Sequence, residues 1–128
     1  MPGRIAARGA WGTVEWAQDA RGQEPAFTFF EGQEAPDQAK ILALFQMLAE
    51  TGRIPNREKF KSLGERGLGL FEFKSFQLRF IGDFRPGKRF LVAHGLRKKK
   101  DELDRVDIET AARILKENDQ REAKERRL

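Results

Sequence analysis

Three consecutive apolar, Phe-rich runs lie between Gly67 and Lys100, and the polar breaks between them predict three antiparallel strands joined as a meander. The first break between the runs falls at Ser75. The second falls at Arg85-Pro86-Gly87, which is typical of a tight turn because proline presets φ and glycine accepts positive φ. The third run, Phe90-Leu91-Val92-Ala93, is apolar at every position, which indicates a strand covered on both faces.

The alternation also assigns side chains to the two faces of the predicted sheet, because successive residues of a strand point to opposite sides. It places Phe71 and Phe73 on one face and Glu72 and Lys74 on the other. By the same rule, Arg79 lies opposite its apolar neighbours in the second strand. If the apolar face forms the core, Lys74 and Arg79 stand together on the second face.

Helical spacing of apolar residues predicts two longer helices. Over residues 36–51 apolar side chains recur at i, i+3, i+4 and i+7, and Gly52 follows as a residue suited to ending a helix. The same spacing after the meander predicts a helix that begins near Asp104 or Asp107. Either carboxylate could accept from the free N–H groups of its first turn.

The remaining sequence predicts shorter elements. Residues 13–16 have β propensity and indicate a first strand. Residues 26–31 are ambiguous between strand and helix, and a short helix is favoured because Pro25 suits a helix start. Residues 53–66 are expected to form a basic loop.

These elements predict one α+β domain over residues 11–118, with the order strand, one or two helices, three antiparallel strands, helix. Residues 1–10 are expected to form a flexible basic arm. Residues 119–128 are expected to form a charged, frayed tail, because they carry almost no apolar side chains.

Positive charge is concentrated in the meander and in the loop before it. From Arg53 to Lys100 there are 14 Lys and Arg against 4 Asp and Glu, an excess of +10, although the net charge of the whole chain is only +5. A polyanion is the natural partner for such a distribution.

Composition excludes several other kinds of site. The chain has no Cys and a single His, His94, so neither a disulfide, a metal site nor a cofactor is expected. No apolar run approaches the roughly 20 residues of a membrane span, and the N-terminus lacks the apolar region of a secretory signal. A cytoplasmic protein without a membrane partner is therefore expected.

Three short stretches, together with the order of the elements, resemble a known superfamily. They are Gly69–Lys74 (GLFEFK), Leu78–Phe80 (LRF) and His94–Lys99 (HGLRKK). In this order they resemble the RelE/ParE toxin superfamily, and most closely its HigB-like, phage-derived branch. The resemblance implies a RelE-like β-α-(α)-β-β-β-α fold. In this fold a small, twisted, mainly antiparallel sheet packs against two N-terminal helices and a C-terminal helix.

The same resemblance implies the toxin of a type II toxin–antitoxin system. Such a toxin is a ribosome-dependent endoribonuclease that cleaves mRNA and inhibits translation. A cognate antitoxin, often a helix-turn-helix protein, holds it inactive. Lys74 and Arg79 match family positions that face the RNA, and Lys98 and Lys99 match the basic cluster after the last strand.

RNA cleavage without a metal needs a base for the 2′-OH proton, positive charge at the phosphate and an acid for the leaving 5′-oxygen. A guanidinium such as that of Arg79 suits the phosphate. For the proton steps the candidates are Lys74, Glu72 and His94, and the sequence does not choose among them. The residues expected to bind RNA are Arg85, Lys88, Arg97, Lys98, Lys99 and Lys100.

The chain has no Tyr, although the superfamily often has an aromatic side chain near the C-terminal helix that stacks on a base. Phe84 and Phe90 are the stacking candidates, because the other Phe residues are expected in the core. The missing Tyr favours an alternative function, that of a catalytically inactive RelE-fold binding protein of phage origin. Such a protein would bind RNA or a gyrase-type target.

Overall fold

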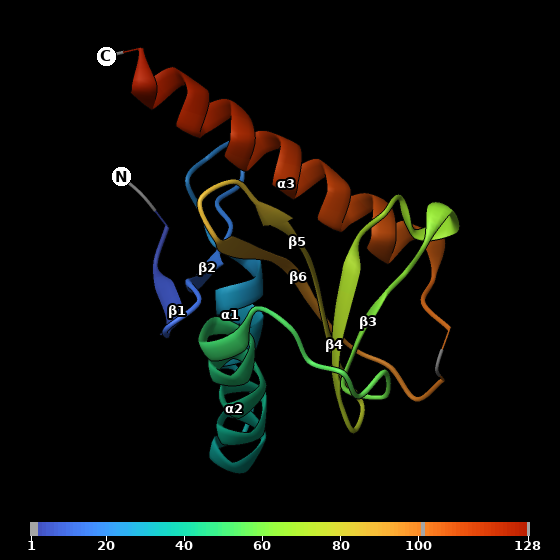
Figure 1. Cartoon of the computed structure of the whole chain (residues 1–128). Coiled ribbons are helices and arrows are strands. Elements are labelled where there is room, and N and C mark those ends of the chain that lie inside the picture. Colours follow the sequence, from blue (N-terminus) through green and yellow to red (C-terminus); the bar gives the residue numbers. More distant parts are fainter. Residues whose placement is uncertain (1–2, 101, 128) are drawn as a thin grey trace.

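The computed structural model describes residues 3–100 and 102–127, which form a six-stranded sheet and three α-helices (Figure 1). The strands lie in the order β1-β2-β6-β5-β4-β3 across the sheet. In chain order the elements are β1 (Ile5–Arg8), β2 (Thr13–Trp16), α1 (Pro25–Glu31), α2 (Ala35–Thr51), β3 (Phe60–Ser62), the 3₁₀ helix η1 (Glu65–Gly67), β4 (Phe71–Ser75), β5 (Leu78–Arg85), β6 (Arg89–Arg97) and α3 (Arg105–Arg126).

The predicted meander is confirmed. β4, β5 and β6 are consecutive antiparallel neighbours, and the register pairs Phe73 with Phe80 and Lys74 with Arg79. The sheet is mixed, because β2 runs parallel to β6 while the other neighbouring strands are antiparallel. The α+β class is confirmed, and the sheet has two strands, β1 and β3, beyond those predicted.

Strand β1 replaces part of the flexible arm expected over residues 1–10. Ile5–Arg8 pairs with β2, Ala7 is buried, and the backbone N–H of Arg4 donates to the Glu24 carboxylate (2.8 Å). The first described residues are therefore held against the sheet and the start of α1. Residues 1 and 2 lie outside the described part of the chain.

Strand β3 lies inside the stretch expected to be a basic loop, residues 53–66. Its three residues pair with β4, and Phe60, opposite Phe73, is the buried side chain among them. A strand this short, with one buried side chain, carries too little alternation to be recognised in a sequence.

An aromatic core fills one face of the sheet, beneath α1 and α2. Trp16, Phe45, Phe73, Phe80 and Phe90 are all buried there. Their rings pack mainly edge to face, as between Phe45 and Phe73, whose centroids are 4.8 Å apart at 74°. α1 confirms the short helix favoured after Pro25, and α2 buries its apolar residues at the predicted spacing. α2 ends at Gly52, whose φ of 76° is the left-handed conformation that ends many helices.

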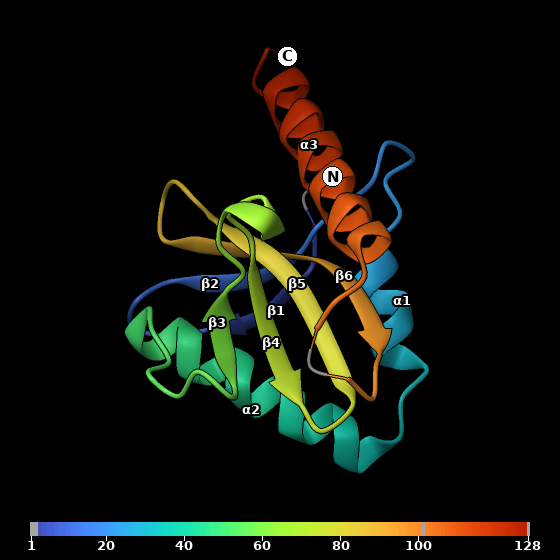
Figure 2. The same cartoon turned by 90° about the vertical axis from the view of Figure 1, so that its right-hand side faces the viewer.

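α3 covers the second face of the sheet, on the side opposite α1 and α2 (Figures 1 and 2). Its Ile108, Ile114 and Leu115 pack with Ile81 of β5 and Leu91 of β6. The sheet is thus covered on both sides, as the uninterrupted apolar run in β6 predicts.

α3 begins directly after Asp104, as predicted, but its N-terminal capping and its C-terminal extent differ from the prediction. Asp104 stands at the N-cap position, but its carboxylate makes no capping hydrogen bond and pairs with Lys98 instead (2.9 Å). The helix continues to Arg126, through most of the residues expected to fray (119–128). Acidic side chains in this last part pair with arginines of the sheet, which stabilises the helix there.

Candidate functional site

Lys74 on β4 and Arg79 on β5 stand directly opposite each other in the register. Their side chains lie on the face that α3 covers, because the preceding cross-strand pair of phenylalanines belongs to the core under α2. Residues 98–100 and 102–104 also lie over this face (Figure 2), and Leu103 packs against the apolar core beneath α3. The face predicted to meet RNA is therefore partly closed.

The guanidinium of Arg79 is buried, with 2% of its side chain exposed. Its Nη1 donates hydrogen bonds to the carbonyl oxygens of Phe76 and Leu78, and its Nε lies 3.4 Å from Glu72 Oε2. Glu72 is itself fully buried and lies 3.8 Å from Lys61 Nζ. The donors of Arg79 thus point into the β4–β5 turn and toward a buried carboxylate.

The end of the β4–β5 hairpin remains accessible. Lys74 is half-buried there, and Phe76, the first residue of the two-residue turn, is 71% exposed with a φ of 52°. Lys40 of α2 lies over the ring of Phe76, with its Nζ 4.2 Å from the centroid. Phe76 is an exposed aromatic residue that strand alternation does not reveal.

Basic residues after β6 border this hairpin end. The backbone N–H of Lys98 donates to the carbonyl oxygen of Gln77 (2.7 Å), which ties the segment to the turn. Arg97 is half-exposed and donates to Gln33 in the loop between α1 and α2 (2.8 Å). Lys99–Lys100 are exposed. The basic cluster predicted after the last strand is therefore at the surface, apart from the half-buried side chain of Lys98.

His94 joins β6 to α3. The register shifts between Ile81 and Gly82, so β6 contains one extra residue, Ala93, at a bulge next to His94. His94 Nε2 lies 2.8 Å from Asp107 Oδ1 on α3, with 20% and 22% of the two side chains exposed. This contact engages one of the two ring nitrogens of His94, Nε2, with α3.

Gly95, the second residue of the His-Gly pair, lies against α1 on the opposite face of the sheet. A Cβ atom there would lie 2.5 Å from the ring of Phe29 in α1 and 2.9 Å from that of Phe80. Glycine therefore allows α1 to pack directly on β6, while the preceding histidine holds α3.

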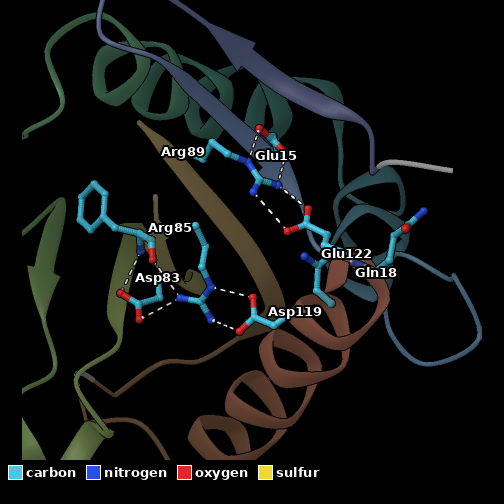
Figure 3. A network of polar contacts seen from close by, with 9 residues as sticks. Glu15, Gln18, Asp83, Arg85, Arg89, Asp119 and Glu122 are labelled. Atoms are coloured by element: carbon cyan, nitrogen blue, oxygen red, sulfur yellow. Dashed lines mark hydrogen bonds and ion pairs between the residues drawn. The ribbon is translucent and has the colours of Figure 1, made fainter. Parts of the chain in front are cut away.

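Arg85, expected to bind RNA, is held in ion pairs next to the turn of the β5–β6 hairpin (Figure 3). It donates to both oxygens of Asp119 on α3 (2.8 and 3.0 Å) and to Asp83 (3.3 Å). Burial alone would lower the pKa of Arg85, but the hydrogen bonds and charges of Asp119 and Asp83 together outweigh burial and raise that pKa. Lys88, at the tip of the same hairpin, is exposed.

Arg89 joins three elements in the same network (Figure 3). It donates to Glu15 of β2 (2.9 and 3.1 Å) and to Glu122 of α3 (2.5 and 3.2 Å), and these hydrogen bonds raise its pKa. Burial alone would raise the pKa of Glu15, but the hydrogen bonds from Arg89 and Thr13, together with the positive charges of Arg89 and Arg8, outweigh burial and lower that pKa. We call this network the α3 clasp, and its members are Glu15, Asp83, Arg85, Arg89, Asp119 and Glu122.

Phe84 and Phe90, the two stacking candidates, are not placed to stack on a base. Phe90 is fully buried, and the ring of Phe84 packs against Trp11 and Phe71 at centroid distances of 5.8 and 5.0 Å. Both rings belong to the aromatic core.

A cleft of about 520 Å³ opens where β3 and η1 meet the start of α3. Arg105 spans it by donating to the carbonyl oxygen of Arg66 (2.6 Å). The cleft is lined by Lys61, Leu63, Arg66, Gly67, Glu102, Leu103, Arg105 and Ile108. Lys61 connects it to the buried carboxylate of Glu72.

A family model described as Phage derived protein Gp49-like (DUF891) matches residues 28–116. The chain belongs to the Gp49-like family. This is a RelE/ParE-like toxin family of toxin–antitoxin systems, so the resemblance found in three short stretches is confirmed at the level of the superfamily. No curated protein matches the chain.

The Gp49-like match covers the meander and ends within α3. Lys74, Arg79 and His94 fall inside it, whereas Asp119 and Glu122 of the α3 clasp fall outside. The HigB-like branch stays a prediction.

Among residues 3–100 and 102–127 of this Gp49-like chain, no group of three or more His, Asp or Glu side chains is placed to hold a metal ion. No helix in the described part of the chain combines the length and the apolar character needed to cross a bilayer.

Two features of this Gp49-like protein were not predicted, namely the exposed Phe76 and the α3 clasp. The position of Phe76 in a turn indicates that its side chain is exposed, since a side chain between two strands lies on neither face of the sheet. Asp119 and Glu122 are three residues apart, which places them on one helix face, but the sequence does not identify their arginine partners.

Proposed function

We propose that this Gp49-like chain is the toxin of a type II toxin–antitoxin system and that it inhibits translation by cleaving mRNA on the ribosome. The observation that carries the proposal is the pairing of Lys74 with Arg79 beside the basic segment Arg97–Lys100. Membership of a toxin family supports the biological role, and the excess of +10 over residues 53–100 supports a polyanionic substrate. Its partners are then a cognate antitoxin, expected to be a helix-turn-helix protein, and the ribosome with its mRNA.

Lys74 carries the first proton step in this proposal. Its neutral amine accepts the proton of the 2′-OH, the 2′-oxygen forms a bond to the adjacent phosphorus, and the bond from phosphorus to the 5′-oxygen breaks. A second group, for which His94 is the candidate, returns a proton to the leaving 5′-oxygen. The products are a 2′,3′-cyclic phosphate and a 5′-hydroxyl.

Arg79 and Glu72 act as positioning residues in this scheme, because both are buried beneath the turn that follows Lys74. The phosphates lie against the segment Arg97–Lys100, whose exposed cations suit them. The ribosome then supplies the orientation of the RNA.

Induced expression tests the proposal. The wild type is expected to arrest growth and protein synthesis and to produce new mRNA 5′ ends in primer extension. Lys74→Met is expected to reduce cleavage by roughly 100-fold or more, in line with the loss of a general acid–base group. His94→Gln reports on the second proton step in the same assay.

Lys116→Met makes the same change at an exposed position on α3 and serves as the control. A soluble wild type that leaves growth and mRNA intact overturns the proposal.

The burial of Arg79 and Glu72 favours a second function, that of a catalytically inactive protein that binds RNA or a gyrase-type enzyme. Growth arrest without new mRNA 5′ ends is the result expected for it. A DNA supercoiling assay with purified gyrase then separates an enzyme target from an RNA target.

A further inference from the structure

Phe76 combines an exposed side chain with an unfavourable backbone conformation. Its side chain is 71% exposed, and its φ of 52° lies in the left-handed region that non-glycine residues rarely adopt. Tight two-residue hairpin turns usually have glycine, asparagine or aspartate at such a position. Neither burial nor backbone preference accounts for a phenylalanine here.

The turn that presents Phe76 is supported from inside the protein. Nη1 of Arg79 donates to the carbonyl oxygens of Phe76 and Leu78, and Arg79 Nε lies 3.4 Å from Glu72. An unfavourable φ persists only where the surrounding structure fixes it, and unfavourable residues of this kind gather at ligand sites. Arg79 provides that fixation.

Cations from several elements surround the exposed ring. Lys40 of α2 lies over it at 4.2 Å, an arrangement in which the ammonium is attracted to the ring face. Arg97 is opposite Leu78 in the register, and the backbone of Lys98 is hydrogen-bonded to Gln77. The ring therefore stands beside positive charge on both sides of the turn.

Two carboxylates also face this cluster. Asp37 Oδ2 lies 3.8 Å from Arg97, and Asp104 Oδ2 lies 2.9 Å from Lys98. Apart from the buried Arg79–Glu72 pair, whose charges cancel, four cations lie near the turn, so the balance is +2 before the exposed Lys99–Lys100 are counted. The four cations are Lys40, Lys74, Arg97 and Lys98.

We propose that Phe76 stacks on a base of single-stranded RNA while Arg97 and Lys98 contact the neighbouring phosphates. The proposal rests on the proposed RNA-directed function and names the contact that holds the RNA at the Lys74 end of the hairpin. Stacking of a base on an aromatic ring requires no particular RNA sequence, because every base has a π-face. The positive charge around Phe76 favours a polyanion over an apolar protein surface as the binding partner.

The test uses the full chain with three substitutions. Phe76→Gly removes the ring and suits the φ of the turn, so the fold is retained, whereas Phe76→Tyr keeps an aromatic ring. Val106→Ala is the matched control, because Val106 is also 71% exposed but lies on α3. The probe is a fluorescent, 2′-O-methylated oligoadenylate of about ten nucleotides, which fits one stacking site and resists cleavage through the 2′-oxygen.

Fluorescence anisotropy at low salt is expected to give a Kd for Phe76→Gly that is roughly 5- to 100-fold weaker than wild type, the loss typical of one stacked base. Phe76→Tyr and Val106→Ala are expected to bind like wild type. Equal binding by Phe76→Gly and wild type, or no binding by wild type, overturns the proposal. Unchanged RNA binding with weaker binding to the cognate antitoxin would assign Phe76 to a protein contact.

Growth arrest by the same variants separates this proposal from the proposed function. If the wild type arrests growth with new mRNA 5′ ends and Phe76→Gly does so equally, only the stacking role is wrong. If the wild type neither arrests growth nor cleaves mRNA, the proposed function is wrong, while the anisotropy series still decides whether Phe76 contacts a base.

Discussion

Glu72 Oε2 and Arg79 Nε lie 3.4 Å apart on neighbouring strands, and neither side chain exposes more than 2% of its surface. Loss of one partner from a buried ion pair costs about 3–5 kcal/mol, whereas replacement of both by apolar residues is often neutral. Arg79→Met is therefore expected to lower the free energy of unfolding by about 3 kcal/mol. Adding Glu72→Leu is expected to restore most of that loss in urea denaturation.

Arg113→Met is the control for this pair, because Arg113 forms an exposed i,i+4 ion pair with Glu117 on α3. Its effect is expected to stay below about 0.5 kcal/mol. A Glu72→Leu/Arg79→Met protein no more stable than Arg79→Met alone would contradict the coupling between the two side chains.

The β4–β5 turn gives a second prediction, independent of RNA. Phe76→Gly is expected to leave the free energy of unfolding unchanged or to raise it by up to about 1 kcal/mol, because glycine adopts positive φ without strain. Phe76→Val is expected to lower it by about 1–2 kcal/mol, since a β-branched side chain disfavours this conformation. Chemical denaturation of the two variants measures the difference, and a Val variant as stable as the Gly variant argues against a strained turn.

The lowered pKa of Glu15 predicts a pH-dependent contribution of the α3 clasp. Because folding depresses this pKa, the added stability is present above the pKa of the unfolded chain and is lost as pH falls through the folded value. The free energy of unfolding of the wild type is expected to fall from about pH 5 downward more steeply than that of Arg89→Met. Parallel curves for the two proteins would mean that Glu15 is not coupled to Arg89.

Packing at Gly95 gives a fourth prediction. Gly95→Ala brings a methyl group within 2.5 Å of Phe29 and 2.9 Å of Phe80, and overpacking of this kind costs about 1–3 kcal/mol. Gly32→Ala is the control, because the nearest atom to its Cβ is 3.5 Å away and its φ is −77°. Thermal unfolding of both variants is the measurement, and equal midpoints would show that α1 moves away from β6 at little cost.

The sequence predicts the strands of the meander well because alternation reports directly on which face a side chain occupies. It correctly places Arg79 opposite the apolar face and beside Lys74. It does not reveal what covers that face. The cover is formed by α3 and by residues 98–100 and 102–104. Their position depends on contacts far apart in the chain, such as that of Leu103 with the apolar core beneath α3.

The burial of individual aromatic residues was also not predictable from the sequence alone. Phe84 and Phe90 lie in strands, and their burial follows from the edge-to-face packing of many rings on one face. Phe76 lies between strands, where periodicity assigns no face at all. Its exposure depends on the hydrogen bonds of a buried arginine, which no local pattern indicates.

The placement of β6 between β2 and β5 has a consequence for how the chain is made. A nascent chain that stops before residue 89 contains the two N-terminal strands and the β3–β5 group, but lacks the strand that pairs with both. Such a pairing across long sequence separations forms late and slowly. During synthesis, therefore, the finished sheet cannot assemble until β6, which ends at residue 97 of 128, has emerged.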